Sequence, residues 1–295
     1  MKKVLLTGID GFTGKYIKDE LISRGYDVIG LVYKEKEPKL GQIACDITDK
    51  KSLQACLNDI RPNYIIHLAA LSFVAHKDQK AFYDVNLFGS LNLLEAAKNI
   101  GLTLDKVIMA SSANIYGNPE NVRKITEDIP PSPVSHYAMS KLSMEYMTRL
   151  WFDSYPIIIT RPFNYTGVGQ EEHFLIPKIV SHFKNGKDTI ELGNTHVARD
   201  FSDVRDIAKA YVALLESNVS SETINLCSGN VYYLNDIISK LEDIAGYNIN
   251  VTVNPDFVRP NEIEVLGGDN YKLEKIVGFK PTINIEKTLS DMFYA

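Results

Sequence analysis

Short apolar runs alternate with helix-like stretches over residues 1–161. Apolar runs at 4–7, 27–33, 64–69, 106–111 and 156–161 predict buried β-strands. Between them, residues 12–24, 49–60, 80–99 and 136–153 have the spacing of amphipathic helices. Alternating strands and helices predict an α/β fold in which a parallel sheet is covered on both faces. Right-handed crossovers would make it a doubly wound Rossmann arrangement.

The regular alternation of predicted strands and helices ends after Arg161. Shorter elements follow, with helices expected over 177–184, 204–217 and 235–245 and a strand over 189–192. We therefore predict a dinucleotide-binding Rossmann domain over 1–162 and a smaller C-terminal α/β lobe over 163–295 that binds substrate. The boundary is expected to be interleaved, with segments from about 195–230 returning to the first domain.

The amino-acid composition excludes several classes of protein. The 295 residues carry 32 basic and 37 acidic side chains and are 45% hydrophobic, which excludes a disordered chain. No basic run favours nucleic-acid binding, and no apolar run is long enough for a membrane helix or a signal peptide. The three cysteines form no CxxC pair and the histidines no HxxxH pair. This pattern indicates no metal site and favours the reducing cytoplasm.

Three glycines follow the first predicted strand. Gly8, Gly11 and Gly14 form a GxxGxxG turn, which also contains Phe12, directly before a helix. Glycine lets the backbone approach a pyrophosphate, and the helix N-terminus offers free N–H groups and the positive end of its dipole. The spacing therefore predicts dinucleotide binding, although three glycines alone could be only a tight turn.

The end of the second strand bears on cofactor choice. NAD-binding turns usually place an acidic residue there for the ribose 2′-OH, but none stands at Val32 or Tyr33. Lys34 could contact a 2′-phosphate, so we expect NADPH to be preferred. NAD remains open because Lys34 could be a solvated residue and Glu35 lies close. Asp46–Ile47 is expected to contact the cofactor's adenine, unless Asp46 is an N-cap or turn residue.

Tyr137 and Lys141 form a YxxxK pair on a predicted helix, and residues four apart share one face. A neighbouring ammonium lowers the pKa of a phenol, which suits acid–base chemistry, and both side chains can also contact the nicotinamide ribose. Ser112 follows the strand over 106–111, where a hydroxyl could bind a substrate oxygen. A packed tyrosine, an exposed lysine and a turn serine are the alternative interpretation.

These features resemble the extended short-chain dehydrogenase/reductase family, in its nucleotide-sugar branch and most closely its GDP-4-keto-6-deoxy-D-mannose reductase group. The resemblance covers nearly the whole chain. It rests on the segments Gly8–Gly14, His67–Ala70, Asp84–Asn86, Ser111–Ser112, Tyr137–Lys141, Arg161–Gln170, Gly193–Asn194, Arg199–Asp206 and Arg259–Pro260.

The resemblance implies a role for each matching residue. Tyr137 would be the acid–base, Lys141 its modulator and Ser112 the hydroxyl that positions the sugar carbonyl. The cofactor would also contact Leu68, Ala69 and Ala70. The nucleotide-sugar would contact Ser72, Ser112, Asn164, Lys178, Arg199 and Arg259. The two arginines suit a diphosphate, because a guanidinium presents a fork of donors. Otherwise Arg199 would pair with Asp200 or Asp203, and Arg259 would be a surface residue.

Two positions discriminate between the reactions of the family. Related 4,6-dehydratases carry an acidic residue where Asn114 stands and often an aspartate where Ala113 stands, and dehydration needs an acid–base pair. We therefore expect NADPH-dependent reduction of the C4 ketone of a nucleotide-linked 4-keto-6-deoxyhexose, with GDP-4-dehydro-6-deoxy-D-mannose the expected substrate and GDP-D-rhamnose or its 4-epimer the product.

The main alternative is a nucleotide-sugar 4-epimerase with tightly bound NAD. A 4,6-dehydratase and a non-catalytic, cofactor-sensing Rossmann protein are less favoured. Neither the nucleotide (GDP, dTDP or CDP) nor the sugar stereochemistry follows from the sequence. The resemblance also implies a homodimer formed through the helices over 80–99 and 136–153.

Overall fold

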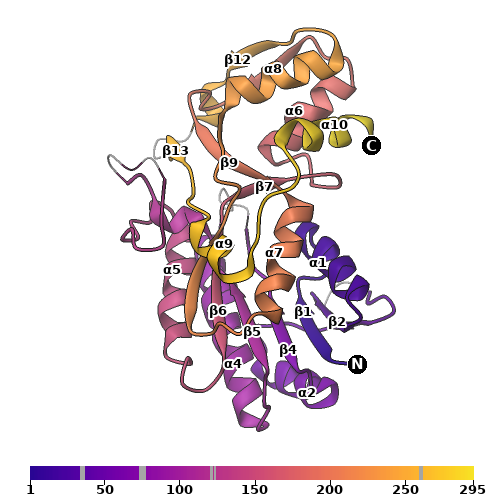
Figure 1. Cartoon of the computed structure of the whole chain (residues 1–295), viewed down its shortest axis with the longest axis vertical. Helices are drawn as coiled ribbons and strands as arrows, with labels where there is room; N and C mark the ends of the chain where they lie inside the picture. Colours follow the sequence, from indigo (N-terminus) through magenta and orange to yellow (C-terminus); the bar gives the residue numbers. More distant parts are fainter. Residues whose placement is uncertain (34–36, 73–77, 120–121, 123, 259–261) are drawn as a thin grey trace. The chain divides into compact units, whose positions relative to one another are not determined.

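The computed structural model covers the whole chain and describes all residues except 34–36, 73–77, 120–121, 123 and 259–261 (Figure 1). The chain divides into two compact units. Unit 1 comprises 1–116, 130–161 and 208–224, and unit 2 comprises 117–129, 162–207 and 225–295. Among the described residues, no helix is both long and apolar enough to span a membrane.

Unit 1 is built on a seven-stranded sheet with the order β10-β6-β5-β4-β1-β2-β3. Its strands are β1 (Lys3–Thr7), β2 (Asp27–Val32), β3 (Gln42–Ala44), β4 (Tyr64–His67), β5 (Lys106–Ala110), β6 (Ile157–Pro162) and β10 (Glu222–Leu226). The pairs within β1–β6 are parallel. Strand order reverses between β1 and β4, where Rossmann folds bind their ligands. The predicted doubly wound α/β fold is confirmed.

Apolar side chains from alternating strand positions fill the core of unit 1. Leu5, Ile65, Val107 and Ile157 are fully buried in one cluster beneath three helices. These helices are α2 (Lys50–Ile60), α4 (Ser90–Asn99) and α5 (His136–Arg149). The same unit contains α1 (Phe12–Ser23) and η2 (Ala113–Tyr116), and α7 (Val204–Glu216) runs from unit 2 into unit 1.

The helix expected over 80–99 is not one regular α-helix. It consists of α3 (Gln79–Phe82), the π-helical segment η1 (Tyr83–Gly89) and α4. The Ser90 hydroxyl donates to the Asn86 carbonyl (2.7 Å) where η1 meets α4. Side-chain bonds of this kind accompany a widened helical turn, which residue spacing alone does not reveal.

Two further elements end earlier than expected. β4 stops at His67 because the next two amides, of Leu68 and Ala69, turn toward the Thr7 hydroxyl (3.1 and 3.0 Å). α5 stops at Arg149, after which the chain forms successive turns up to residue 154.

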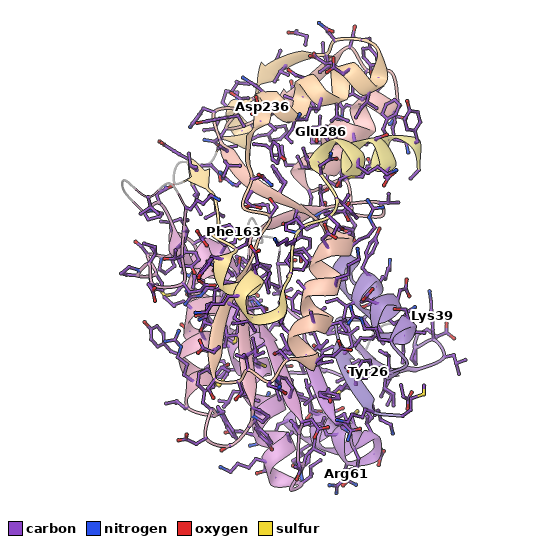
Figure 2. All side chains as sticks on the ribbon, in the orientation of Figure 1. Tyr26, Lys39, Arg61, Phe163, Asp236 and Glu286 are labelled. Carbon is purple, nitrogen blue, oxygen red and sulfur yellow. The ribbon has the colours of Figure 1, made fainter. Side chains whose placement is uncertain are left out.

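Unit 2 packs small sheets against helices. Its strands are β7 (Asn164–Thr166), β8 (Thr189–Leu192), β9 (Ala198–Asp203), β11 (Val231–Tyr233), β12 (Asn250–Val253) and β13 (Val265–Leu266). Its helices are α6 (Leu175–Lys184), α8 (Leu234–Ala245), η3 (Pro255–Phe257), α9 (Tyr271–Val277) and α10 (Ile285–Tyr294). The apolar faces of α6, α8 and α10 share one core. An ion pair between Lys240 and Glu286 joins α8 to α10, and Asp236 caps α8. Figure 2 labels Asp236 and Glu286.

Candidate active site

The glycine turn joins β1 to α1 in unit 1. Gly8 has a φ of +73°, a backbone conformation that side chains with a Cβ rarely adopt. A Cβ on Gly14 would lie 2.2 Å from the Gly8 carbonyl oxygen, so only glycine lets the helix pack this closely. Gly11 is the N-cap of α1, so the turn leads directly into the N-terminus of that helix. The positive end of the helix dipole suits a phosphate, and the close-packed turn fits a dinucleotide.

The other cofactor candidates lie at nearby strand ends or outside the described residues. Leu68, Ala69 and Ala70 are partly buried just after β4, which is hydrogen-bonded beside β1. The Asp46 carboxylate accepts bonds from the backbone N–H and the hydroxyl of Thr48 (2.9 and 2.7 Å). Asp46 thus has the turn role that its sequence position allowed. Lys34 lies outside the described residues.

Tyr137 and Lys141 are both buried on α5, at 8% and 5% exposure. The Ser135 side chain caps the helix by accepting from the Ala138 N–H (3.2 Å), so the N-cap lies two residues before Tyr137. The Tyr137 ring packs edge-to-face on Phe82. The Lys141 ammonium donates to the Ala110 carbonyl at the end of β5 (2.7 Å). The YxxxK pair is therefore anchored at the carboxyl edge of the sheet.

Two serine hydroxyls follow β5 directly. The Ser112 Oγ accepts a bond from the Asn114 N–H (3.2 Å) and is buried. The Ser111 Oγ is buried with no hydrogen-bond partner among the described residues. A buried hydroxyl without a partner is costly, so a bound ligand that satisfied it would gain affinity. This edge of unit 1 therefore suits a polar ligand.

Lys141 belongs to a buried network of charged side chains. Burial lowers its pKa to about 8, and Glu145, one helical turn further along α5, opposes that shift. The Glu145 carboxylate forms two bonds to the Arg161 guanidinium (2.9 and 2.7 Å), and Arg161 also donates to the Tyr116 hydroxyl (2.8 Å). The carboxylate holds the pKa of Arg161 above its ordinary value despite burial.

The substrate candidates Asn164 and Arg199 lie in unit 2. β7 pairs in parallel with β9, and Asn164 is opposite Phe201. Because side chains alternate along a strand, Asn164, Phe201 and Arg199 share one face. The Arg199 guanidinium pairs with Glu262 (2.6 Å) and donates to the Glu264 carbonyl (3.2 Å). Its ion pair is thus with an acid that the sequence did not single out.

Of the remaining substrate candidates, Lys178 is on α6 of unit 2. Its ammonium donates to the Glu191 carbonyl (2.7 Å) and lies over the Phe257 ring. Ser72 is exposed in unit 1, after β4. Arg259 lies outside the described residues.

Three aspartates of the segment Arg199–Asp206 hold two loops and helix α10 of unit 2. Asp200 accepts bonds from the Ser228 hydroxyl and the Gly229 N–H (both 2.7 Å). Asp203 accepts from the Thr288 hydroxyl, and Asp206 accepts from that of Thr282 (both 2.7 Å). These three aspartates therefore stabilise the structure of unit 2 by hydrogen-bonding segments that are distant in the sequence.

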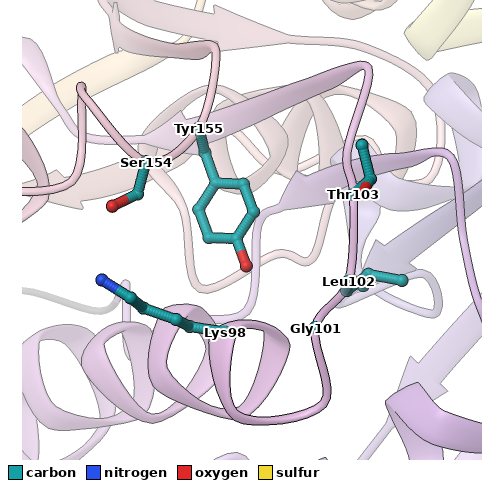
Figure 3. A pocket seen from close by; sticks show the side chains of 6 residues that line it. All are labelled: Lys98, Gly101, Leu102, Thr103, Ser154 and Tyr155. Atoms are coloured by element: carbon teal, nitrogen blue, oxygen red, sulfur yellow. The ribbon is translucent and has the colours of Figure 1, made fainter.

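A shallow cavity of about 330 Å³ lies away from this chemistry (Figure 3). Thr103 and Tyr155, which line it, precede β5 and β6, so it is at the opposite edge of the sheet from Ser112. Lys98 also lines it, and its ammonium lies over the Trp151 ring. We assign the cavity no catalytic role, because the candidate catalytic side chains lie at the other edge.

Several buried polar side chains beside the site could not be assigned a role from the sequence. His67, Asn86 and Ser140 are buried and hydrogen-bonded to one another or to their neighbours. Glu145, four residues beyond Lys141, carries the same i, i+4 spacing as the YxxxK pair. That spacing was the available signal for Glu145.

Comparison with known proteins shows the family to which the chain belongs. The family described as GDP-mannose 4,6 dehydratase matches residues 5–292. The chain is 36% identical to GDP-6-deoxy-D-talose 4-dehydrogenase of Aggregatibacter actinomycetemcomitans, over 94% of this chain and 91% of that protein. It is 30% identical to GDP-6-deoxy-D-mannose reductase of Pseudomonas aeruginosa, over 98% of this chain and 95% of that protein.

A solved structure is similar throughout. The structure of RMD from Pseudomonas aeruginosa complexed with NADPH superimposes with a TM-score of 0.86 at 29% identity, covering 100% of this chain and 98% of that one. The glycine turn, the YxxxK helix and the strand order thus occur together with a sequence match along almost the entire length. The chain therefore belongs to the GDP-mannose 4,6 dehydratase family, within the extended short-chain dehydrogenases/reductases, and is an NAD(P)-dependent nucleotide-sugar oxidoreductase.

Proposed function

We propose that this enzyme is an NADPH-dependent 4-ketoreductase that acts on a nucleotide-linked 4-keto-6-deoxyhexose. One observation carries the proposal. Lys141 and Ser112 are held where β5 ends, and Tyr137 is one turn before Lys141 on the same helix. The two positions where related dehydratases carry acids hold Ala113 and Asn114. Tyr137, Lys141 and Ser112 suffice for hydride chemistry at one carbon, whereas dehydration needs two titrating groups.

The residues of unit 1 have separate roles in cofactor binding, proton donation and charge stabilisation. The bound cofactor supplies the hydride, and the glycine turn holds its pyrophosphate. The Tyr137 hydroxyl donates a proton to the oxygen of the reduced carbonyl, and the Ser112 hydroxyl hydrogen-bonds the same oxygen. The Lys141 ammonium, fixed by the Ala110 carbonyl, stabilises negative charge on the phenol oxygen after the proton leaves.

Unit 2 is proposed to bind the nucleotide-sugar. Asn164 and Arg199 share one face of its sheet, and Arg199 has the donor fork that suits a diphosphate. Binding would exchange the Glu262 carboxylate for phosphate oxygens around that guanidinium. Lys178 and Arg259 are included on the family resemblance. We propose GDP as the nucleotide because the two curated relatives named above act on GDP-sugars.

We further propose a homodimer in the cytoplasm. Large exposed apolar or aromatic side chains lie on η1 (Phe88), on α5 (Met139 and Tyr146) and directly after α5 (Leu150), and η1 and α5 are packed neighbours. Covering them with the same surface of a second copy would remove apolar area from water. Three free cysteines fit a reducing compartment.

The decisive experiment supplies GDP-, dTDP- and CDP-linked 4-keto-6-deoxyhexoses with NADPH or NADH and identifies the products by NMR. We expect one NADPH oxidised per keto sugar consumed, and no 4-keto-6-deoxy product from GDP-mannose or dTDP-glucose. A 4-epimerase would instead keep NAD through purification and consume no added cofactor. Robust dehydratase activity, or a clear NADH preference, would overturn the corresponding part of the proposal.

A matched variant tests the chemistry. Tyr137→Phe removes one hydroxyl and is expected to lower kcat about 10²- to 10⁴-fold, the usual effect of losing a positioned general acid. Its NADPH affinity should stay close to wild type. Near-normal reduction by this variant would refute the assigned role, and a signalling protein that only senses the cofactor would be indifferent to the change.

A further inference from the structure

A continuous line of buried hydrogen bonds crosses unit 1 beside the candidate active site. The Thr7 Oγ1 and the His67 Nδ1 are 2.8 Å apart on paired positions of β1 and β4. The His67 Nε2 is 3.0 Å from the Ser90 Oγ, which is 2.7 Å from the Asn86 carbonyl. These four side chains are at most 3% exposed. Solvent therefore does not substitute for any of the bonds.

The direction of each bond follows by elimination. The Thr7 oxygen already accepts from the Leu68 and Ala69 N–H groups (3.1 and 3.0 Å), so its own hydrogen points to His67. The His67 Nδ1 is then an acceptor, and the Nε2 carries the hydrogen and donates to Ser90. The Ser90 hydroxyl donates onward to the Asn86 carbonyl. A single neutral tautomer of His67 satisfies every group.

The line continues into the catalytic helix. The Asn86 side-chain amide donates to the Ser140 Oγ (3.0 Å), and the Ser140 hydroxyl donates to the Tyr137 carbonyl (2.8 Å). Ser140 precedes Lys141 directly. The bonds therefore join the strand end before the phosphate turn to the helix that carries the proton donor.

We propose that His67 is a positioning residue whose Nε2–H tautomer holds the YxxxK helix at a fixed offset from the ends of β1 and β4. The inference rests on the proposed function, because those strand ends would hold the cofactor while the helix holds Tyr137. Hydride and proton transfer require the cofactor and the Tyr137 hydroxyl to be held at fixed positions relative to the substrate. A misplacement of about 1 Å can lower the rate about 10²-fold.

The surroundings disfavour a charged His67. A proton on Nδ1 would face the Thr7 oxygen, whose lone pairs are both occupied by backbone N–H groups. Burial lowers the pKa of His67 to about 3, and the Lys141 ammonium adds to the shift. The ring is therefore neutral at pH 5.5 and above, and the helix position does not vary with histidine titration there.

The first test reads the tautomer directly in the NADPH-bound enzyme. The ¹⁵N-histidine spectrum is recorded at pH 5.5, and the His67 signals are assigned by their loss in His67→Asn. We expect a neutral ring protonated at Nε2, at a pH where exposed histidines are charged. A charged ring, or one protonated at Nδ1, would overturn the proposal. This measurement needs no turnover, so it is independent of the proposed reaction.

The second test separates positioning from stability. Thr7→Val keeps the side-chain shape but removes the hydroxyl, and Thr7→Ser restores it. Thr148→Val is the matched control, because Thr148 is a fully buried threonine on α5 outside the line. We expect Thr7→Val to lower kcat about 10- to 100-fold with little change in the KM for the sugar. The kcat of Thr7→Ser and of the Thr148→Val control should stay within about threefold of the wild-type kcat.

Equal kcat losses in Thr7→Val and Thr148→Val would mean that only stability is affected, and the inference would fail. If Thr7→Val does not fold, Ser90→Ala, which removes the acceptor of the His67 Nε2–H, takes its place with the same expectation. A wild-type enzyme that reduces no keto sugar would refute the proposed function while leaving the tautomer result to decide the hydrogen-bond assignment.

Discussion

Replacing Lys141 by Met removes a buried ammonium from α5 and is expected to abolish turnover while changing how stability depends on pH. The lysine is 5% exposed, and burial lowers its pKa from 10.5 to about 8. The unfolded chain therefore keeps its proton to a higher pH than the folded protein does. Wherever the unfolded state binds more protons, the free energy of unfolding rises with pH. Wild-type stability should gain from this group between about pH 8 and 10.5.

The magnitude follows from the same linkage. Burying Lys141 costs about 3 kcal/mol at pH 7, where the folded state holds it charged, taking about 1.4 kcal/mol per pH unit between the two pKa values. At pH 10, where the folded state holds it neutral, the cost is about 1 kcal/mol. The variant avoids this cost but leaves the Ala110 carbonyl without its donor, which costs roughly 1–3 kcal/mol at any pH. The stability of Lys141→Met relative to wild type should thus fall by about 2 kcal/mol from pH 7 to pH 10.

Urea unfolding at pH 7, 8, 9 and 10 measures this difference. Lys51→Met, which changes an exposed lysine on α2, controls for the general effect of losing a positive charge. A constant difference between Lys141→Met and wild type across this range would refute the reasoning. It would mean that the ammonium is not desolvated as the structure indicates.

Three further changes test other parts of the site. Glu145→Gln leaves the Arg161 guanidinium without its carboxylate and should cost about 3–5 kcal/mol of unfolding free energy in urea, whereas a cost below about 1 kcal/mol would show that the buried pair is unimportant. Gly14→Ala drives a methyl group against the Gly8 carbonyl and should weaken NADPH binding at least about tenfold by fluorescence titration, and unchanged affinity would contradict the packing argument. Arg199→Ala should raise the KM for the nucleotide-sugar by the equivalent of about 2–5 kcal/mol without altering the NADPH Kd, and an unchanged KM would assign Arg199 to structure alone.

Some of the fold could be predicted from short-range pattern. The strand before Gly8 and the helix after Gly14 follow from apolar spacing and from glycine, whose effect on the backbone is local. Asp49 caps α2 by accepting from the amides two and three residues later, so that helix start is also encoded within a few positions. The YxxxK spacing likewise places Tyr137 and Lys141 on one face of α5.

Other features depend on which strands become neighbours. Thr7 and His67 are 60 residues apart and meet only because β1 pairs with β4. Arg199 and Glu262 are 63 residues apart, so the acid that pairs with Arg199 could not be chosen from sequence over the nearer aspartates. The sequence by itself therefore determined the glycine turn, the catalytic spacing and the class of fold, which depend on local geometry. The tertiary structure alone decided the partners of the buried charges and the neutral state of His67, because burial and long-range pairing arise only when the sheet is assembled.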